Sequence, residues 1–474
     1  MQQLSGLDAA FLELDTPTST GHVGGVHVID AVPSGQTRPL TLEGLTETVA
    51  ERLHLVPPMR RRLVEVPFGL DQPYWIEDPA FDVEFHLREL ALPAPGSTAQ
   101  LTEQVARIHA RPLDRARPLW EIYLIHGLDG GARAALYVKL HHAMIDGVAG
   151  QEVSAALLDQ HPEGRQIPPA PPWEPDPAPG GMALLGRGVG HLALRPQWAL
   201  RILGRLVRRS PDVAATVLAP RLPGWSRLVD DPDVMFRAPV RVPATPFNKA
   251  VTPHRRVALR IVPLEQVKAV KNEAGVTVND VVLAMCAGAL RKWLTDHAAL
   301  PDGPLVAAVP ISIRGADGGF GNRVSLMLAR LPTDCQDPFE RLEVCHESTL
   351  RAKEEHDALP AGILSDAYAL TMPALVGLAT RANAKLRLLE RMNVFNLFIS
   401  NVPGPSQPLY IAGHQVLATY PVSAIMHGQG LNITVISYLG GLHFGLIADR
   451  ALVPDLDVLA EYLAEELEEL AAQV

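Results

Sequence analysis

Residues 136–147 read Leu-Tyr-Val-Lys-Leu-His141-His142-Ala-Met-Ile-Asp146-Gly147, an apolar run followed by two histidines and a turn. The apolar run predicts a buried strand, and a helix is expected to open near Asp146 and Gly147. Ligands of α/β proteins bind beyond the carboxyl ends of strands, so the histidines lie where a site is expected. A neutral imidazole accepts a proton from an alcohol or thiol near neutral pH, because its unperturbed pKa is about 6.5. The stretch therefore predicts a histidine base at a strand end.

Structural alternatives stay open for each of these residues. Neighbouring side chains alternate across a strand, so at most one of His141 and His142 faces a given site. Asp146 is expected to cap the helix, to fix the turn or to pair with an arginine, and Gly147 permits close approach of backbone. The pattern lacks a histidine pair four residues apart on a helix and a third ligand at a usual spacing. We therefore predict no metal site.

Length and composition argue against several classes of protein. The chain has 474 residues, 47% hydrophobic and 20% charged, which favours two or three globular domains. A formal net charge of −10 argues against a nucleic-acid-binding protein. No apolar run is long enough for a membrane span, and the first fifteen residues carry three acids and no base, unlike a secretory signal. The three cysteines, which form neither a disulfide framework nor a metal-ligand pattern, are Cys286, Cys335 and Cys345. We predict a cytosolic protein, or one attached to a membrane from the cytosolic side.

A change in composition marks the main boundary in the chain. Eight prolines lie within residues 162–181 and predict an extended linker. Residues 181–228 then hold eight arginines against one acid, and apolar residues recur at helical spacing in residues 198–209. Such a basic amphipathic helix is typical of a membrane-surface element or of an interdomain helix whose arginines pair with acids, and both interpretations stay open. The predicted segments are an N-terminal lobe, a connector and a C-terminal lobe, spanning residues 1–161, 162–245 and 246–474.

Both lobes mix helix and strand patterns, which predicts two mixed α/β lobes of similar size. The β-branched and aromatic runs predict strands at residues 23–29, 120–125, 134–140, 256–262, 305–310, 324–329, 395–400 and 431–438. Helical periodicity predicts helices at residues 42–53, 148–158, 264–274, 280–297 and from about 454.

The chain carries a series of motifs that together resemble one enzyme family. His141-His142-x-x-x-Asp146-Gly147 resembles the signature of CoA-dependent acyltransferases related to chloramphenicol acetyltransferase and to peptide condensation domains. Further motifs, in the same order as in the family, are Leu4-Ser-Gly-Leu-Asp8-Ala-Ala-Phe11, His22-Val-Gly-Gly25, Pro118-Leu119-Trp120-Glu121, Asn279-Asp280, Gly321-Asn322-Arg323-Val324-Ser325, Ser400-Asn401-Val402-Pro403-Gly404-Pro405 and Gly430-Leu431-Asn432-Ile433. From about residue 4 to residue 450, the chain resembles the bacterial wax ester synthase/acyl-CoA:diacylglycerol acyltransferase family.

The resemblance implies a fold and a reaction. The fold would be two chloramphenicol acetyltransferase-like lobes with a central channel at their interface. The reaction would move a long-chain acyl group from acyl-CoA to a fatty alcohol or diacylglycerol, with no cofactor besides the co-substrate and no covalent intermediate. His142 would be the base, with His141 beside it, and Asp146 would be held by an arginine. The candidate arginines, among which the sequence does not decide, are Arg60, Arg61 and Arg62.

The other motif residues receive supporting roles. Pro118, Leu119 and Trp120 resemble the family's Pro-Leu-Trp motif, and a large apolar Trp120 suits a strand edge or the wall of an acyl tunnel. Asn279 is expected to be a helix N-cap with Asp280 at the positive end of the helix dipole. We expect these residues, like Gly147, to support the site rather than to react.

Alternatives remain for the substrate and for the activity itself. The same fold could acylate another hydroxyl acceptor, such as a polyketide or secondary metabolite, or serve as a catalytically silent lipid-binding protein. The chain has no Gly-x-Ser-x-Gly elbow, and its Gly186-x-Gly188-x-Gly190 does not follow a strand, so a serine hydrolase and a dinucleotide site are not expected. Poorly soluble substrates favour peripheral attachment to the inner face of the membrane or to lipid droplets. The sequence leaves the oligomeric state open.

Overall fold

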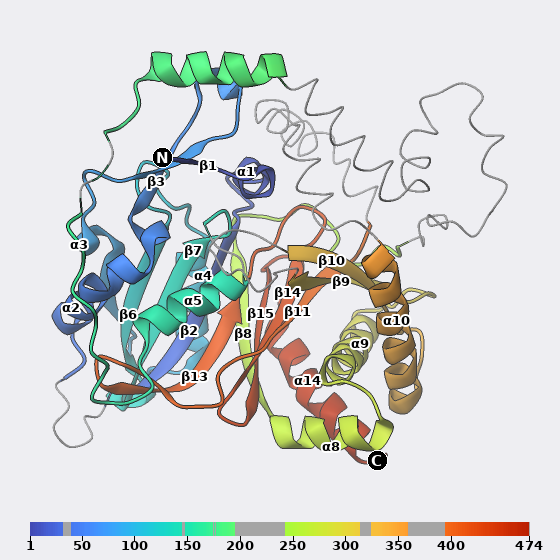
Figure 1. The fold of residues 1–474 in the computed structure, drawn as a ribbon. Coiled ribbons are helices and arrows are strands. Elements are labelled where there is room, and N and C mark those ends of the chain that lie inside the picture. Colours follow the sequence, from blue (N-terminus) through green and yellow to red (C-terminus); the bar gives the residue numbers. More distant parts are fainter. Residues whose placement is uncertain are drawn as a thin grey trace, which may run out of the picture.

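The computed structural model describes residues 1–31, 39–144, 147–173, 175, 177–194, 242–312, 324–358 and 394–473. Two six-stranded sheets of mixed orientation form the centres of two lobes that lie side by side (Figure 1). A small three-stranded sheet lies at one end of the N-terminal lobe, and its strands, in the order β1-β4-β3, are Gln2–Gln3, Tyr74–Glu77 and Arg61–Val64. The mixed α/β fold predicted from the sequence is confirmed.

The sheet of the N-terminal lobe has the order β12-β13-β2-β7-β6-β5. All its pairs are antiparallel except β5 with β6. Its strands are β2 (His22–Asp30), β5 (Leu87–Ala91), β6 (Trp120–Leu128), β7 (Arg133–His141), β12 (Leu409–Ile411) and β13 (His414–Val422). Alternate residues face two different cores, as the period of a strand requires. Leu136 of β7 packs in the core that contains helix residues Val49 and Val153, whereas Tyr137 packs with Val105 on the other face.

Helices cover both faces of this sheet. Those described in the N-terminal lobe are α1 (Gly6–Glu13), α2 (Leu42–Arg52), α3 (Val83–His86), α4 (Thr98–His109) and α5 (Gly147–Leu157). Residues of α2 and α5 pack in one core, and residues of α4 pack in the other together with Val257 and Ile447 of the C-terminal lobe. Helix α4 therefore lies between the two lobes.

The sheet of the C-terminal lobe has the order β10-β9-β11-β14-β15-β8, in which β11 runs parallel to both β9 and β14. Its strands are β8 (Arg255–Pro263), β9 (Leu305–Ser312), β10 (Val324–Leu331), β11 (Leu397–Val402), β14 (Leu431–Tyr438) and β15 (Gly441–Asp449). Among the described residues, the helices packed around it are α8 (Leu264–Ala274), α9 (Val278–Asp296), α10 (Pro338–Ala358) and α14 (Leu456–Ala471).

Helix α9 is the central helix of the C-terminal lobe, and most of its side chains are buried. In the part of the chain that the structure describes, no single helix is long and apolar enough to cross a membrane. Helices α8 and α9 meet at 104°, and together they have the length and apolar composition that a bent membrane span would need. The core helix of a globular protein has the same length and composition, and α9 is such a buried helix.

The two lobes share strands and side chains. Strands β12 and β13 come from the second half of the chain, yet β13 pairs with β2 of the N-terminal sheet. The Tyr438 hydroxyl, at the end of β14, donates to the carbonyl of Val416 at 2.7 Å and accepts from the N–H of Leu409 at 2.9 Å. These contacts join the C-terminal sheet to β12 and β13, which belong to the sheet of the N-terminal lobe. The exact ranges of the three predicted segments stay a prediction.

The predicted amphipathic helix of residues 198–209 lies outside the described residues. A different helix, residues 181–194, is described, and it lies against the three-stranded sheet at the end of the N-terminal lobe (Figure 1).

Candidate active site

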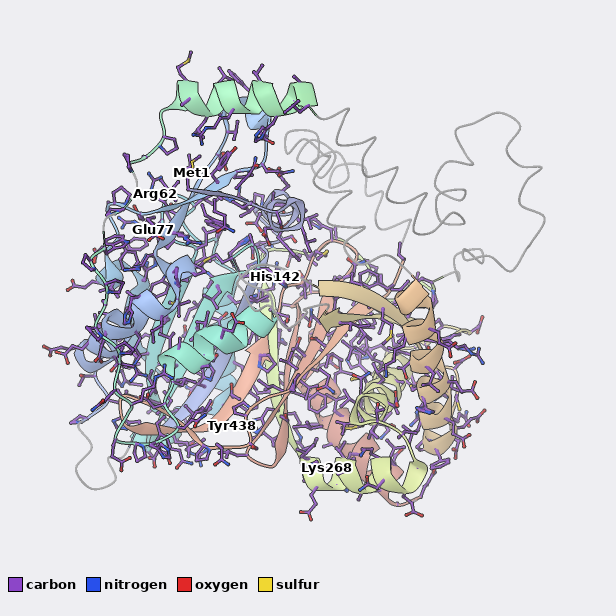
Figure 2. The ribbon with its side chains drawn as sticks, in the orientation of Figure 1. Met1, Arg62, Glu77, His142, Lys268 and Tyr438 are labelled. Carbon is purple, nitrogen blue, oxygen red and sulfur yellow. The ribbon has the colours of Figure 1, made fainter. Side chains whose placement is uncertain are left out.

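The histidine pair lies at the end of β7, where the two lobes meet (Figure 2). His141 is the last residue of the strand, and His142 is the first residue of the turn that follows. The His142 backbone N–H donates to the carbonyl of Gly21 at 2.8 Å. The His142 ring is half-buried and stacks on Phe11 of α1, with 4.1 Å between ring centroids and 14° between the planes. Backbone and ring are therefore both held in place.

The two histidines differ in what their rings contact. His141 is buried, and its Nδ1 accepts from the N–H of Ala143 at 3.1 Å. The proton of the neutral ring is then on Nε2, which donates to Oδ2 of Asp15 at 3.0 Å. Both nitrogens of His141 are committed to structural hydrogen bonds. Its side chain is thereby unsuited to take a proton from a substrate.

Asp15 organises the backbone around this pair. Its Oδ1 accepts from the N–H of Gly21 at 2.6 Å, and its Oδ2 also lies 3.3 Å from the guanidinium of Arg115. Burial by itself would raise the pKa of Asp15, but the hydrogen bonds from the His141 ring and from the Gly21 N–H help to outweigh burial and lower that pKa. One carboxylate thus fixes His141 and the residue whose carbonyl holds His142.

Replacing Asp15 with asparagine is expected to lower kcat by about tenfold or more, with a smaller change in KM. Asparagine offers one acceptor oxygen instead of two, and a hydrogen bond to a charged group contributes about 1.5–3 kcal/mol. The measurement is steady-state release of CoA from acyl-CoA with an alcohol acceptor. Asp129→Asn is the matched control, because Asp129 is half-exposed and pairs only with Arg133 at the surface among the contacts described. An unchanged kcat in Asp15→Asn would remove the positioning role.

A row of buried polar groups lies on the same face of β7 as His141. His22 Nδ1 donates to the carbonyl of His109 at 3.0 Å, and Nδ1 of His109 lies 2.6 Å from the Tyr137 hydroxyl. Burial, together with the nearby charge of Lys139, lowers the pKa of His22 and of His109 well below the usual range, so both rings are neutral near pH 7. The Lys139 ammonium, fully buried, donates to carbonyls at the end of α4. These groups support the strand that carries the site.

Lys139 makes the stability of the fold depend on pH in a defined window. Burial lowers the pKa of Lys139 to about 8, from 10.5. Between these values the unfolded chain holds a proton that the folded chain has released, so the free energy of unfolding gains up to about 1 kcal/mol per pH unit as pH rises above 8. Lys139→Met is expected to remove this gain, measured by urea unfolding at pH 8 and about 9.5. The exposed Lys268→Met is the control, and an identical gain in both variants would contradict the assignment.

The Pro-Leu-Trp motif lies beside the histidines and inside the core. The N–H of His141 donates to the carbonyl of Leu119 at 3.0 Å, and Leu119 and Trp120 are completely buried. The Trp120 indole N–H donates to the carbonyl of Met59 at 2.7 Å, and the ring stacks on His86. Pro118 begins the segment, and its carbonyl accepts from the N–H of Trp120. These contacts support the strand end, and a contact with substrate stays a prediction.

The Asn-Asp motif begins α9, but the expected N-cap is wrong by two residues. Thr277 is the cap, because its hydroxyl accepts from the N–H of Asp280 and the Asp280 carboxylate accepts from the N–H of Thr277 at 2.9 Å. Asn279 therefore lies within the first turn. Asp280 is fully buried and also accepts from His346 at 2.8 Å and Thr349 at 2.6 Å on α10. Although burial alone would raise it, the pKa of Asp280 is lowered by these bonds.

Asp146 lies outside the described residues, so its partner among the three candidate arginines stays a prediction. Each candidate arginine has another contact. Nε of Arg61 lies 3.1 Å from Oε1 of Glu77, and Nε of Arg62 lies 3.3 Å from Oδ1 of Asp78. The guanidinium of Arg60 lies over the ring of Trp173. Gly147 is the first residue of α5. Within the described ranges, no group of three His, Cys, Asp or Glu side chains could hold a metal ion.

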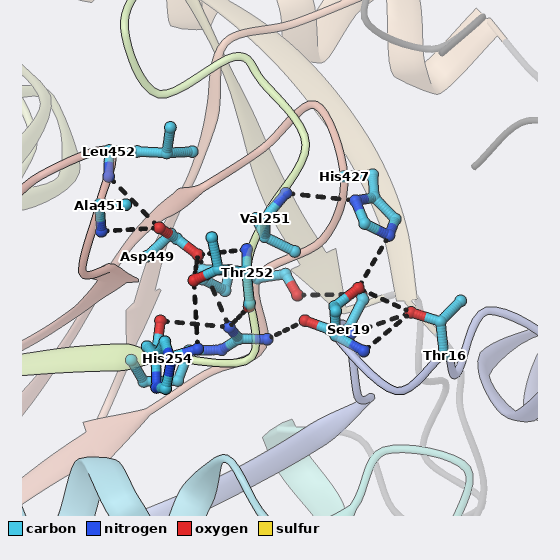
Figure 3. A network of polar contacts seen from close by, with 12 residues as sticks. Thr16, Ser19, Val251, Thr252, His254, His427, Asp449, Ala451 and Leu452 are labelled. Atoms are coloured by element: carbon cyan, nitrogen blue, oxygen red, sulfur yellow. Dashed lines mark hydrogen bonds and ion pairs between the residues drawn. The ribbon is translucent and has the colours of Figure 1, made fainter. Parts of the chain in front are cut away.

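The loop between α1 and β2 connects the site to the C-terminal lobe (Figure 3). The carbonyl of Thr18 accepts from the Arg255 guanidinium at 2.6 Å, and its hydroxyl lies 3.3 Å from Nε2 of His427. The Ser19 hydroxyl donates to the carbonyl of Ile425 at 3.3 Å. The loop that holds His142 through Gly21 is therefore attached to both lobes.

Sequence reasoning did not assign roles to Phe11, Asp15 or Gly21. Phe11 lies in a motif of the resemblance, but its stacking on His142 needs the folded position of α1. Asp15 lies 126 residues before its partner His141 and in no motif, so no local signal points to it.

Comparisons with known proteins identify the family. The model of the wax ester synthase/diacylglycerol acyltransferase catalytic domain matches residues 4–282, and that of the WS/DGAT C-terminal domain matches residues 320–471. The O-acyltransferase WSD of Acinetobacter baylyi is 33% identical over 99% of this chain and 96% of that protein. A protein of Mycobacterium tuberculosis, named as a candidate diacylglycerol O-acyltransferase, is 35% identical over 99% of this chain and 90% of its own length.

Solved structures agree with these relatives. The wax ester synthase/diacylglycerol acyltransferase of Marinobacter aquaeolei is 32% identical, with a TM-score of 0.69 over 100% of this chain and 99% of that one. The first condensation domain of the CDA synthetase shares the fold at 18% identity, with a TM-score of 0.55 over 99% of this chain and 96% of that one. The chain therefore belongs to the wax ester synthase/diacylglycerol acyltransferase family and is an acyltransferase.

Proposed function

We propose that the protein moves a long-chain acyl group from acyl-CoA to the hydroxyl of a fatty alcohol or a diacylglycerol, with His142 as the general base. The observation that carries the proposal is that the His141 ring is already engaged on both nitrogens. His141 has both ring nitrogens engaged, with Ala143 and Asp15, whereas the half-buried His142 ring is fixed by stacking on Phe11. Of the pair, His142 is the one suited to meet a substrate.

In the proposed reaction both substrates are bound together. The acceptor oxygen attacks the thioester carbonyl carbon while its proton passes to the His142 imidazole. The tetrahedral intermediate then collapses, the carbon–sulfur bond breaks, and the imidazolium returns the proton to the leaving thiolate of CoA. The products are an ester and CoA, and the enzyme ends in its starting protonation state. Such a base contributes about 10²–10⁴-fold, and holding two substrates in line contributes further.

The position of His142 supports this direct transfer. The site lies where the two lobes meet, which suits an approach of acyl-CoA and acceptor from different sides along the predicted central channel. The stacked ring of Phe11 restricts the His142 ring to one plane, and a fixed plane keeps the accepting nitrogen aimed in one direction.

The proposal is tested by incubating the purified protein with palmitoyl-CoA and either hexadecanol or dioleoylglycerol. Free CoA is measured with a thiol reagent, and the lipid product is identified by mass spectrometry. We expect release of CoA that requires the acceptor and matches ester formation one to one. Release of CoA without ester, or no release with either acceptor, would contradict the proposed function.

We further propose that the protein works at a lipid surface on the cytosolic side, because its acceptors dissolve poorly in water. The stretch 177–211 contains six arginines and no acid, in a chain whose formal net charge is −10, which supports attraction of this part to anionic lipid.

A further inference from the structure

The helix of residues 181–194 packs on the small sheet through one face only. Leu184 is buried against Val66 and Tyr74. Gly188, one turn later, comes so close that an added Cβ would lie 3.0 Å from the side chain of Val66. His191, three residues further on, lies 2.5 Å from Oδ2 of Asp71. Positions 184, 188 and 191 share one side of a helix, so this side is the inner face.

The outer face of the same helix is apolar and open to solvent. At helical spacing, Met182, Gly186, Val189 and Ala193 lie opposite the inner face, and all four are exposed. Met182 is 81% exposed and Val189 is 54% exposed. A surface helix normally turns polar or charged side chains to water, whereas the outer face of this helix turns apolar side chains to water.

A neighbouring loop presents a further large apolar side chain. Phe68 lies between Val66 and Leu70, which both pack in the same small core as Leu184, and its side chain is 82% exposed. Its backbone has a φ of 60°, in the left-handed region that bulky residues rarely adopt. An exposed phenyl ring on a strained turn indicates a residue that binds a partner molecule or a membrane.

The sequence of the helix and of its flanking residues is basic. The helix contains Arg187, which is exposed, and no acid. The chain from residue 177 to residue 211 contains no acid at all, although the protein as a whole is acidic. Apolar side chains that project outward with arginine beside them fit the interface of an anionic bilayer, where rings and methyl groups enter and guanidinium groups meet phosphates.

We propose that the outer face of helix 181–194, together with Phe68, is the surface by which the enzyme docks on an anionic phospholipid membrane. The position of this surface suits the proposed function, on which the inference rests. The small sheet beneath the helix continues from β1 into α1, and α1 carries Phe11, the ring stacked on His142 (Figure 1). Docking would therefore turn the end of the lobe nearest the catalytic histidine toward the membrane that holds the acceptor.

Vesicle flotation of the full-length protein tests the surface. Vesicles contain phosphatidylcholine alone or with phosphatidylglycerol, at low and at high salt. The double variant Phe68→Ser/Met182→Ser is expected to lose at least about tenfold in partitioning, because two exposed apolar side chains no longer enter the lipid. Arg187→Gln should lose about fivefold at low salt and little at high salt. The matched control is Leu350→Ser, a 47% exposed leucine on α10, and it should bind as the wild type does.

Two activity assays separate this proposal from the proposed function. The double variant should acylate a short, water-soluble alcohol at the wild-type rate and should acylate vesicle-borne diacylglycerol at least about fivefold more slowly. A different result would separate the two proposals: the wild type floats with anionic vesicles, the double variant does not float, and the wild type acylates neither acceptor. The proposed function would then fail, and the docking surface would stand.

Three results would overturn the docking surface. The first is a double variant that floats like the wild type. The second is a wild type that floats with no vesicle at low salt. The third is light scattering that shows a wild-type dimer and a monomeric double variant with equal flotation, because the face would then bind a second copy of the chain.

Discussion

Replacing His142 with alanine is expected to slow acyl transfer by about 10²–10⁴-fold, while acyl-CoA binds as tightly as to the wild type. The imidazole is proposed to take the proton of the attacking hydroxyl, so its loss affects the transition state more than the bound substrates. The rate is measured as release of CoA at saturating acyl-CoA and alcohol, and binding is measured by calorimetry without acceptor.

His126→Ala is the control for this variant. His126 lies on β6 of the same sheet, is about one-third exposed and pairs with Glu89 at 3.3 Å, so the same ring is removed from a place without a proposed role. We expect its rate to stay within about twofold of the wild type, as for most surface substitutions. A folded His142→Ala enzyme with the full rate would reject His142 as the base.

Replacing Glu466 with leucine is expected to lower the free energy of unfolding by about 3–5 kcal/mol, because it leaves a buried charge without its main partner. Glu466 on α14 contacts the guanidinium of Arg341 on α10, and the two side chains are 1% and 3% exposed. Its second oxygen lies 3.2 Å from Lys292 on α9. Gly288 makes room for the carboxylate, since an added Cβ would lie 1.8 Å from Oε2. Through Arg341 and Lys292, Glu466 therefore connects three helices.

The stability change is measured as the shift of the urea unfolding midpoint at pH 7. Glu469→Leu on the same helix is the matched control, because Glu469 is 48% exposed and pairs with Lys292 at the surface. Its expected change is below about 1 kcal/mol. The double variant Arg341→Met/Glu466→Leu should regain most of the loss, since it buries no unpaired charge. Equal midpoints for Glu466→Leu and Glu469→Leu would contradict this account.

The parts of the fold that sequence reasoning predicted are those with strong local periodicity. The runs that became β2, β6, β7, β8 and β14 are apolar or β-branched, and the predicted strands lie inside the observed ones. Strand β15 was missed although all its residues are buried, because Gly441 and Gly445 weaken its pattern. Gly445 is needed there, since an added Cβ would lie 1.7 Å from the carbonyl of Pro421. The crossing of β12 and β13 into the other lobe has no local signal, because strand pairing is set by tertiary packing.

Sequence reasoning predicted the position of the candidate site but not the hydrogen bonds within it. The end of β7 was predicted from its motif, and the rule that neighbouring residues alternate indicated that the two histidines would differ. The hydrogen bonds of the His141 ring depend on Asp15 and on Ala143, and the first of these comes from a distant part of the chain. The N-cap of α9 was misplaced because Asn279 is a good cap by type, whereas Thr277 forms the reciprocal pair with Asp280.

If His142 takes the proton of the acceptor hydroxyl, a single-turnover measurement of CoA release isolates that step. Wild type and His142→Gln are each loaded with palmitoyl-CoA and mixed rapidly with saturating decanol, and the first-order release of CoA is followed. Glutamine keeps a polar side chain of similar reach but does not act as a base at neutral pH. We expect the variant to release CoA about 10²–10⁴-fold more slowly at unchanged acyl-CoA affinity. Equal rates of release would contradict the role of His142 as the base.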